Sequence, residues 1–264
     1  MILSPIEQSI KNKIESVGTP LKDWDINIYR GVLTGCNEAF IISTEKRNEI
    51  LNNCTTEEER QRTEELIRPI LRGRDIKRYG YEWAGLYLIA TFPSRHYDID
   101  EYPAVKQHLL SFGIERLEQT GKKYTINGQQ VTARKKTTNK WFETQDSISY
   151  WEDFKKPKIV WNRIASIKQF AKVDEYVLIQ DSMHFVVGEQ LEYLCSVLNS
   201  KIIQWLLFTI IGEAAGGNAG NADNIWNLPI PKTKMDNPVT DMWLYDRYGL
   251  SEEEVRFIES QQNQ

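Results

Sequence analysis

The chain has 264 residues, of which 41% are hydrophobic and 27% are charged, and its formal net charge is −4. These values are typical of a globular protein with a sizeable core. No apolar run reaches the roughly 18 residues of a membrane span, and the N-terminus carries no export signal. The three cysteines are far apart and form neither a disulfide framework nor a zinc pattern. We therefore expect a cytoplasmic protein without a membrane partner.

The first half of the chain mixes helices and strands. Ile6, Ile10 and Ile14 predict a short amphipathic helix that Gly18 and Pro20 end. Alternating apolar residues across 25–43 predict two short strands with a glycine turn. Thr56 followed by Glu59 is a capping box, so a helix is expected up to the residue before Pro69. Residues 85–93 predict a buried strand.

In the second half, Pro103 near the first turn predicts a helix that Gly121 closes. Asn127-Gly128 predicts a hairpin turn, and short strands follow between residues 158 and 188. Residues 190–211 predict one long central helix, and Ser251 with Glu254 begins a short acidic one. Since strands and helices do not alternate regularly, we predict a single α+β domain with short, largely antiparallel strands and packing helices.

Positive charge is concentrated in three stretches of this acidic chain. Residues 68–81 hold five cations around Asp75, while 121–140 and 155–172 each hold six cations and no acid. Such segregation predicts a positive face that attracts polyanions. For any one run, a solvated surface remains the alternative interpretation.

Signs of catalysis are weak. The glycine-rich segment 212–224 follows a helix and does not match the GxGxxG fingerprint of nucleotide folds, and the Pro-Pro-aromatic signature of amino-methyltransferases is absent. Asp75 with Lys77 and Asp153 with Lys155 match the Asp-x-Lys part of a magnesium-dependent nuclease site, with acids upstream at Glu64, Glu65 and Asp146. The three histidines have no ligand-spaced partner, and His184 is expected to be structural.

Seven segments, in chain order, together resemble a known family. They are GVLTGCNEAFII, IRPILRGRDIKRY, YPAVKQHLLSFGIERLEQTG, WFETQDSISYWEDFKKPKIVWNRIA, YVLIQDSMHFV, LCSVLNSKIIQWLL and GGNAGNADNIWNLPIPK. The set resembles the TaqI-like C-terminal specificity domain of type IIG restriction-modification enzymes and related adenine-specific DNA methyltransferases. Its last segment also resembles the target recognition domains of type I specificity subunits. The resemblance covers about residues 20–232.

This resemblance implies a division of the chain and a partner. Residues 1–19 would form an N-terminal linker helix, 20–232 a DNA target recognition domain, and 233–264 a C-terminal extension with an acidic helix. The domain would bind sequence-specifically to double-stranded DNA and position it for a catalytic methyltransferase or nuclease module of the same polypeptide. No catalysis and no cofactor are then expected in this chain alone, while S-adenosylmethionine and Mg belong to the parent enzyme, a type II restriction enzyme or DNA adenine methyltransferase.

Arginine and lysine suit phosphate contacts, and the arginine fork also pairs with guanine. In the hairpin region, Gln129, Gln130, Thr138 and Asn139 are further candidates for base edges, and Arg134 is the best candidate for a base-reading arginine. The predicted DNA-binding residues are Arg72, Arg74, Lys77, Arg78, Lys122, Lys123, Arg134, Lys135, Lys136, Lys140, Arg163, Asn218 and Asn221.

Three alternatives stay open on the residues alone. In the first, Asp75 would pair with Arg72 or Arg78, and this segment would stabilise the fold and not bind DNA. The basic hairpin would be a disordered loop. The whole chain would be a nuclease of the Asp…Asp/Glu-x-Lys type, or an RNA-binding or protein-interaction domain. Neither the DNA sequence recognised, nor whether the parent cleaves or methylates, nor the oligomeric state follows from the sequence.

Overall fold

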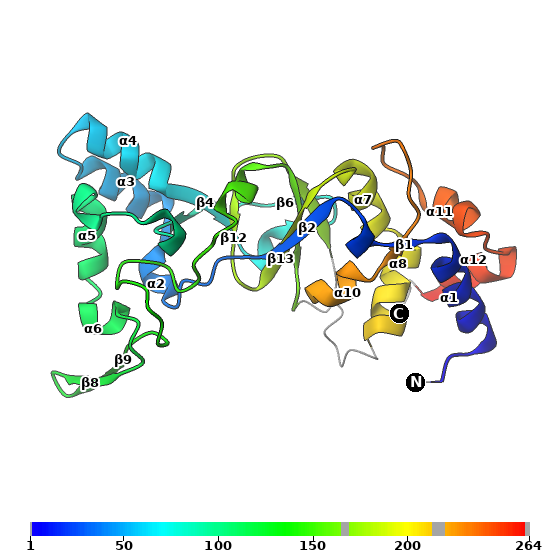
Figure 1. Cartoon of the computed structure of the whole chain (residues 1–264), viewed down its shortest axis with the longest axis horizontal. Helices are drawn as coiled ribbons and strands as arrows, with labels where there is room; N and C mark the ends of the chain where they lie inside the picture. The colour runs from blue at the N-terminus through cyan, green and yellow to red at the C-terminus, as the bar shows by residue number, and fades with distance from the viewer. Residues whose placement is uncertain (1, 165–168, 213–219, 262–264) are drawn as a thin grey trace.

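The computed structural model describes residues 2–164, 169–212 and 220–261. Helices and short strands follow one another irregularly, and every pair of named strands but one is antiparallel within these ranges. The fold is therefore α+β, as predicted. Figure 1 shows an elongated molecule with helices gathered towards both ends and most of the strands between them.

The central sheet is antiparallel throughout and has the strand order β11–β10–β13–β2. Along β10, Ile159 and Trp161 lie in one hydrophobic core and Val160 lies in another, because side chains alternate across a strand. The sheet thus separates two cores. Its strands are β2 (Ile26–Arg30), β10 (Lys158–Asn162), β11 (Phe170–Val173) and β13 (Met183–Gly188).

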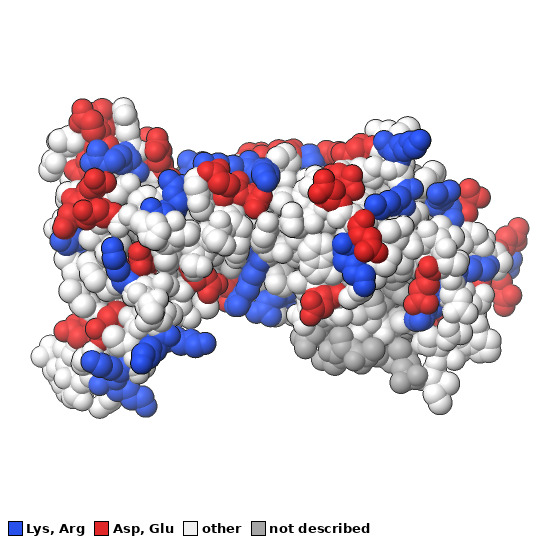
Figure 2. All heavy atoms as spheres, in the orientation of Figure 1, with Lys and Arg blue, Asp and Glu red and all other residues white. Residues whose placement is uncertain are grey.

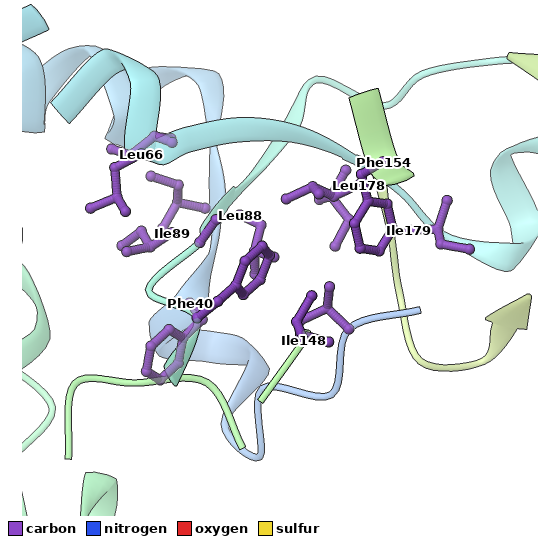
Figure 3. Packing of buried hydrophobic residues seen from close by; sticks show 14 of the residues in the cluster. Phe40, Leu66, Leu88, Ile89, Ile148, Phe154, Leu178 and Ile179 are labelled. Atoms are coloured by element: carbon purple, nitrogen blue, oxygen red, sulfur yellow. The ribbon is translucent and has the colours of Figure 1, made fainter. Parts of the chain in front are cut away.

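The first core lies between the central sheet and a second four-stranded sheet, β12–β4–β7–β3. In it, Leu88 and Ile89 of β7 belong to one cluster with Phe40, Leu66 and Phe154, all labelled in Figure 3. The second sheet contains β3 (Ile41–Ser43), β4 (Ile67–Leu71), β7 (Leu86–Ile89) and β12 (Leu178–Ile179), which is parallel to β4. Five helices belong to this half: α2 (Asn37–Phe40), α3 (Thr44–Asn52), α4 (Glu57–Leu66), α5 (Pro103–Leu110) and α6 (Ile114–Leu117).

The second core is mainly helical and lies on the other face of the central sheet. Ile10 and Ile14 of the first helix are fully buried there, as their spacing predicts. Its helices are α1 (Pro5–Val17), α7 (Leu191–Leu198), α8 (Lys201–Trp205), the π-helix η6 (Leu206–Ile211), α10 (Ala222–Trp226), α11 (Asp241–Tyr248) and α12 (Glu252–Gln261). A two-stranded pair joins β1 (Thr19–Pro20) to β14 (Pro229–Ile230).

The remaining elements are short. The predicted hairpin is confirmed: Asn127 and Gly128, with φ of 51° and 80°, connect β8 (Lys123–Ile126) to β9 (Gln129–Thr132). A second small pair joins β5 (Ile76–Lys77) to β6 (Gly80–Tyr81). The 3₁₀ turns are η1 (Leu21–Asp23), η2 (Gly73–Asp75), η3 (Pro93–Arg95), η4 (Ile99–Glu101) and η5 (Trp151–Lys155).

The capping signals in the sequence are confirmed. The Thr56 hydroxyl accepts a hydrogen bond from the Glu59 amide at 3.1 Å and starts α4. Ser251 and Glu254 bond reciprocally at the start of α12, where the Ser251 amide donates to the Glu254 carboxylate at 2.6 Å. Both helices therefore begin where a side-chain oxygen satisfies a free amide.

Two helices that were predicted to be continuous are each interrupted in the structure. The helix predicted over 190–211 is broken, because the Asn199 amide donates to the carbonyl of Phe170 at 2.8 Å and Ser200 then caps α8. The helix predicted to run to Gly121 is interrupted at Gly113, whose φ of 84° is left-handed and separates α5 from α6.

No single helix among the described residues is long and apolar enough to cross a membrane. The bent pair Leu191–Leu198 and Lys201–Ile211, with 57° between its parts, meets the length and composition requirements only together. Most of its side chains are buried in the second core.

Candidate nucleic-acid interface

The four strands of the central sheet bring residues from distant parts of the chain to one end. Asn162 of β10 is paired with Met183 of β13, and Arg30 of β2 is paired with His184. Phe170 of β11 lies opposite Trp161 of β10. Because these pairs share one end of the sheet, the segments that enter and leave there are neighbours.

Two arginines at this end share Asp181. The guanidinium of Arg30 pairs with its carboxylate, with Nη2 3.2 Å from Oδ2, and Nε of Arg163 donates to its main-chain carbonyl at 3.4 Å. The Tyr150 hydroxyl donates to the Arg30 carbonyl at 2.9 Å. Arg163 is thus held beside Arg30, although 133 residues separate them in sequence.

The basic turn at 72–78 lies against the same end. A Cβ built on Gly73 would lie 2.1 Å from the Asn162 side-chain nitrogen, so a larger residue would require the Asn162 side chain to move. The Tyr79 amide donates to Phe170 at 2.9 Å. Arg74 and Lys77 are exposed; Lys77 lies 3.6 Å from Glu82, and no hydrogen bond or ion pair joins Arg74 to any described residue.

The two other arginines of this turn hold the fold. Arg72 pairs with the buried Asp75, with Nη2 2.8 Å from Oδ1 and Nε 3.2 Å from Oδ2. Its amide donates to the same carboxylate at 2.8 Å. Arg78 donates to the Asn199 carbonyl at 2.8 Å. The bracing interpretation of Asp75 is therefore correct for Arg72.

The hairpin and its base carry a separate set of lysines. Their side chains are exposed and make no hydrogen bond or ion pair with the described residues, although Lys140 lies over the Phe142 ring at 5.6 Å. The β8–β9 hairpin is an ordered pair of strands, so the disordered-loop interpretation is wrong. The set comprises Lys122, Lys123, Lys135, Lys136 and Lys140.

Asp146 connects the hairpin base to the end of the sheet. Burial raises the pKa of its carboxyl group, the charges of Arg30 and Lys135 lower it, and Asp181 raises it further. Its amide is 3.2 Å from the Leu33 carbonyl, next to the end of β2. The charges of Arg30 and Lys135 thus both act on this one carboxyl group.

We call the resulting surface the basic edge. Figure 2 shows Lys and Arg side chains gathered over the β8–β9 hairpin and again on the lower rim of the central part, with a hollow between the two groups. The edge includes Arg30, Arg74, Lys122, Lys123, Lys135, Lys136, Lys140 and Arg163.

Arg134 does not belong to this surface, and its assignment as a base reader was wrong. Its side chain is 4% exposed and donates to the carbonyls of Leu117, Thr34, Glu143 and Trp141 at 2.7–2.8 Å. Burial lowers the pKa of this guanidinium to about 10, so it remains charged at neutral pH. A group that satisfies four carbonyls inside the protein is unavailable to a ligand.

The last two predicted residues lie near the late glycine-rich segment. Trp161 of β10 donates to the Gly220 carbonyl at 3.0 Å, which brings the start of α10 to the central sheet. Asn221 precedes this helix and is half-buried, and its side chain does not cap it. Asn218 lies outside the described residues.

The model of the TaqI-like C-terminal specificity domain matches residues 68–230, more than half of the chain. The chain belongs to this family. The TaqI-like specificity domain thus includes the turn at 72–78, the hairpin and the central strands β10, β11 and β13, while β2 with Arg30 precedes the matched range.

No curated protein sequence matches this specificity domain. Among solved structures, it is similar to the type IIG restriction endonuclease BpuSI, with 15% identity and a TM-score of 0.49 over 95% of this chain and 27% of that one. It is also similar to the type IIL restriction-modification enzyme MmeI, solved in complex with DNA, with 12% identity and a TM-score of 0.42 over 69% and 21%. The chain spans less than a third of the length of either.

The aspartates of the two Asp-x-Lys motifs, Asp75 and Asp153, are both engaged in ion pairs within the specificity domain. Asp75 is held by Arg72, and Asp153 pairs with Lys156 at 2.6 Å. Lys155, the other half of the second Asp-x-Lys motif, pairs with Glu152 at 3.3 Å. Among the described residues, no three His, Cys, Asp or Glu side chains form a group that could hold a metal ion.

Sequence reasoning missed Arg30. It stands alone at the end of a strand, so no basic run marks it. The signal was its position before Gly31, where the chain approaches Gln180 so closely that a Cβ would lie 2.1 Å from a carbonyl oxygen. Arg30 precedes this close approach, so it lies where β2 meets the segment that contains Gln180.

Proposed function

We propose that this specificity domain recognises a sequence in double-stranded DNA and positions it for a catalytic methyltransferase or nuclease module of the same polypeptide. In this proposal the parent is a restriction-modification enzyme that acts on adenine. S-adenosylmethionine and Mg would serve the catalytic module. Residues 20–232 would be the recognition domain, with 1–19 as a linker helix and 233–264 as an extension.

The observation that carries the proposal is the basic edge. Lysines on the hairpin and an arginine on the turn have no ion-pair partner among the described residues, whereas cations elsewhere on the surface, such as Lys11, Lys46 and Lys106, pair with acids. Unpaired cations on a rim are suited to phosphates, because each contact releases condensed counterions. Family membership adds that the domain determines specificity.

The hairpin supplies candidates for base contacts. Its two strands of four residues project from the body (Figure 1), and a two-stranded ribbon fits a major groove about 12 Å wide. Gln129 is exposed without a side-chain partner among the described residues, whereas Gln130 donates to Thr125 at 3.0 Å. Asn139 is occupied, because its amide donates to the Gln145 carbonyl at 2.9 Å. We therefore assign direct base contact to Gln129 first.

Binding of the domain to fluorescent duplexes as a function of salt tests this function. With about six phosphates neutralised, log K should fall with log salt at a slope near −5. The charge reversal Lys135→Glu/Lys136→Glu should abolish binding at low salt. Lys11→Glu/Arg256→Glu is the matched control, because it changes the charge equally on α1 and α12, where both residues pair with acids.

Two results would contradict the proposal. One is equal binding of the hairpin variant and the wild type at low salt. The other is tighter binding of RNA duplexes or heparin than of DNA, which would favour an RNA-binding or protein-interaction domain. Since a catalytic module would contact the opposite side of the duplex, a weak absolute affinity alone does not contradict it.

A further inference from the structure

A second cationic site lies away from the basic edge. It is a pocket of about 430 Å³, within the range of small-molecule sites. Its floor is apolar, with Leu66, Ala90, Phe92 and Tyr102 all less than 10% exposed. Its walls include Tyr97, Trp151 and Tyr176, and four cations line it: Arg62, Arg68, Arg95 and Lys155. We call it the aromatic pocket.

The aromatic pocket and the basic edge lie at opposite ends of the same strands. β4 runs from Arg68 in the pocket towards Arg72, and β10 runs from near Lys155 to Asn162. β12 likewise leads from Tyr176 towards Asp181. Four or five residues of extended chain span roughly 13–17 Å, so one phosphate cannot contact both sites.

The cations of the pocket lie on aromatic rings. The guanidinium carbon of Arg95 is 3.6 Å from the centre of the Trp151 ring, and Lys155 Nζ is 4.5 Å from the same ring. Arg68 lies over Tyr176 at 4.4 Å. Such contacts hold a guanidinium in place by its face and leave its N–H edges available to an acceptor.

The positive charges of the aromatic pocket outnumber the negative charges near them. Glu65 also lines the pocket, and Glu152 pairs with Lys155, so four positive charges face two negative ones. Within the described ranges, the side chain of Arg62 donates only to the Glu101 carbonyl, at 3.1 Å. Nε of Arg68 is buried without a hydrogen-bond partner, and no carboxylate among the described residues pairs with that guanidinium. The terminal N–H groups of Arg68, which lines the pocket, also make no hydrogen bond with the described residues, so they are the donors available to an anion there.

We propose that the aromatic pocket binds a nucleoside 5′-monophosphate unit, either as a free nucleotide or as the phosphorylated end of a single strand. The phosphate accepts from Arg68 and the rim cations Arg62 and Lys155. The base stacks on the Arg95 guanidinium, which already lies on Trp151, because nucleobases stack well on arginine planes. This inference is independent of the duplex site on the basic edge.

Calorimetric titration with AMP tests the pocket. We expect one AMP to bind, and adenosine and inorganic phosphate to bind at least about tenfold more weakly, because each offers half of the contacts. Arg68→Gln should weaken AMP binding about tenfold or more through a lost charged hydrogen bond. Arg95→Ala should weaken it about tenfold or more because the base loses its stacking surface. Lys136→Ala removes one charge from the basic edge and should leave AMP binding unchanged.

Competition identifies the source of the ligand. Displacement of AMP by a 5′-phosphorylated single strand supports a strand end, and its failure to displace AMP supports a free nucleotide. Three results would overturn the proposal: no AMP binding at millimolar concentration, equal loss in Lys136→Ala, or displacement of AMP by a duplex without exposed phosphorylated ends. Arg95 is exposed, so Arg95→Ala decides the matter should Arg68→Gln fail to fold.

Discussion

The guanidinium of Arg134 donates a hydrogen bond to the Thr34 carbonyl at 2.7 Å, across 100 residues of sequence. The same side chain lies over the Phe40 ring at 5.0 Å and reaches three further carbonyls near the hairpin base. Arg134 thus fastens the hairpin to the body of the domain, next to lysines that face solvent.

We predict that Arg134→Ala lowers the free energy of unfolding by at least about 3 kcal/mol. Four carbonyls each lose a donor, three of these hydrogen bonds are buried, and an unsatisfied buried acceptor costs roughly 1–3 kcal/mol. Urea unfolding followed by circular dichroism measures the loss. Lys135→Ala, one residue away and exposed, should stay within about 0.5 kcal/mol of the wild type. Equal stability of both variants would refute the fastening role.

Substitutions of the two arginines Arg72 and Arg74, which lie in one turn, should affect different properties: stability for Arg72 and DNA binding for Arg74. Arg74→Ala should leave unfolding unchanged, weaken binding to all duplex sequences alike and reduce the salt slope by about one unit, because Arg74 has no partner among the described residues. Arg72→Ala should lower stability by about 1–3 kcal/mol, because it leaves the buried Asp75 without its guanidinium. Paired unfolding and salt-titration measurements compare them. A stability loss in Arg74→Ala as large as in Arg72→Ala would contradict this division.

Local signals in the sequence predicted much of the fold. The Asn127-Gly128 turn, the Thr56 and Ser251 caps and the buried face of α1 depend on residues within a few positions of one another. Such local patterns predict the structure well because their hydrogen bonds and packing involve residues close in sequence. The break before Ser200 also had a local signal, since serine is a favoured first cap, but the apolar run around it suggested one continuous helix.

The site was harder to predict, because distant segments determine which cations face outwards. Within the run 134–136, Arg134 is buried and both lysines are exposed. What distinguishes them is the set of carbonyls at Thr34, Leu117 and Trp141, which no local pattern reveals. The position of Arg30 on the basic edge likewise depends on a residue distant in sequence, because its guanidinium pairs with Asp181.

The C-terminal helix should make stability depend on acid pH. Although burial opposes it, hydrogen bonds from Lys13, the Ser251 amide and Ser9 lower the pKa of Glu254 from 4.5 to about 2. A carboxylate with a depressed pKa contributes its full stability above pH 4.5 and loses it as the pH falls towards 2. Glu254→Gln should therefore cost about 1–3 kcal/mol at neutral pH and progressively less across this range. Glu252→Gln, an exposed ion-pair partner, is the control in unfolding experiments. A pH-independent difference would contradict the assignment.

His184 should make the stability of the fold depend on pH in a higher range than Glu254 does. Burial, with the charges of Arg163 and Arg30, lowers the pKa of its imidazole from 6.5 to about 4. The folded protein then binds fewer protons than the unfolded chain, so this residue reduces stability as the pH falls from 6.5 towards 4. The expected change is up to about 3 kcal/mol, and it should be absent in His184→Gln. NMR titration should find the imidazole neutral at pH 6. A midpoint near 6.5 in the folded domain would be incompatible with this environment.

The central sheet has a consequence for how this domain can diversify. Because neighbouring residues of β10 serve different cores, a change within that strand disturbs both halves of the molecule together. The turns and the hairpin at the strand ends carry the exposed cations but few of the core side chains. Substitutions of those exposed cations alter what the surface presents while the scaffold stays intact. The architecture thus separates the residues that determine the surface charge from those that hold the two cores together.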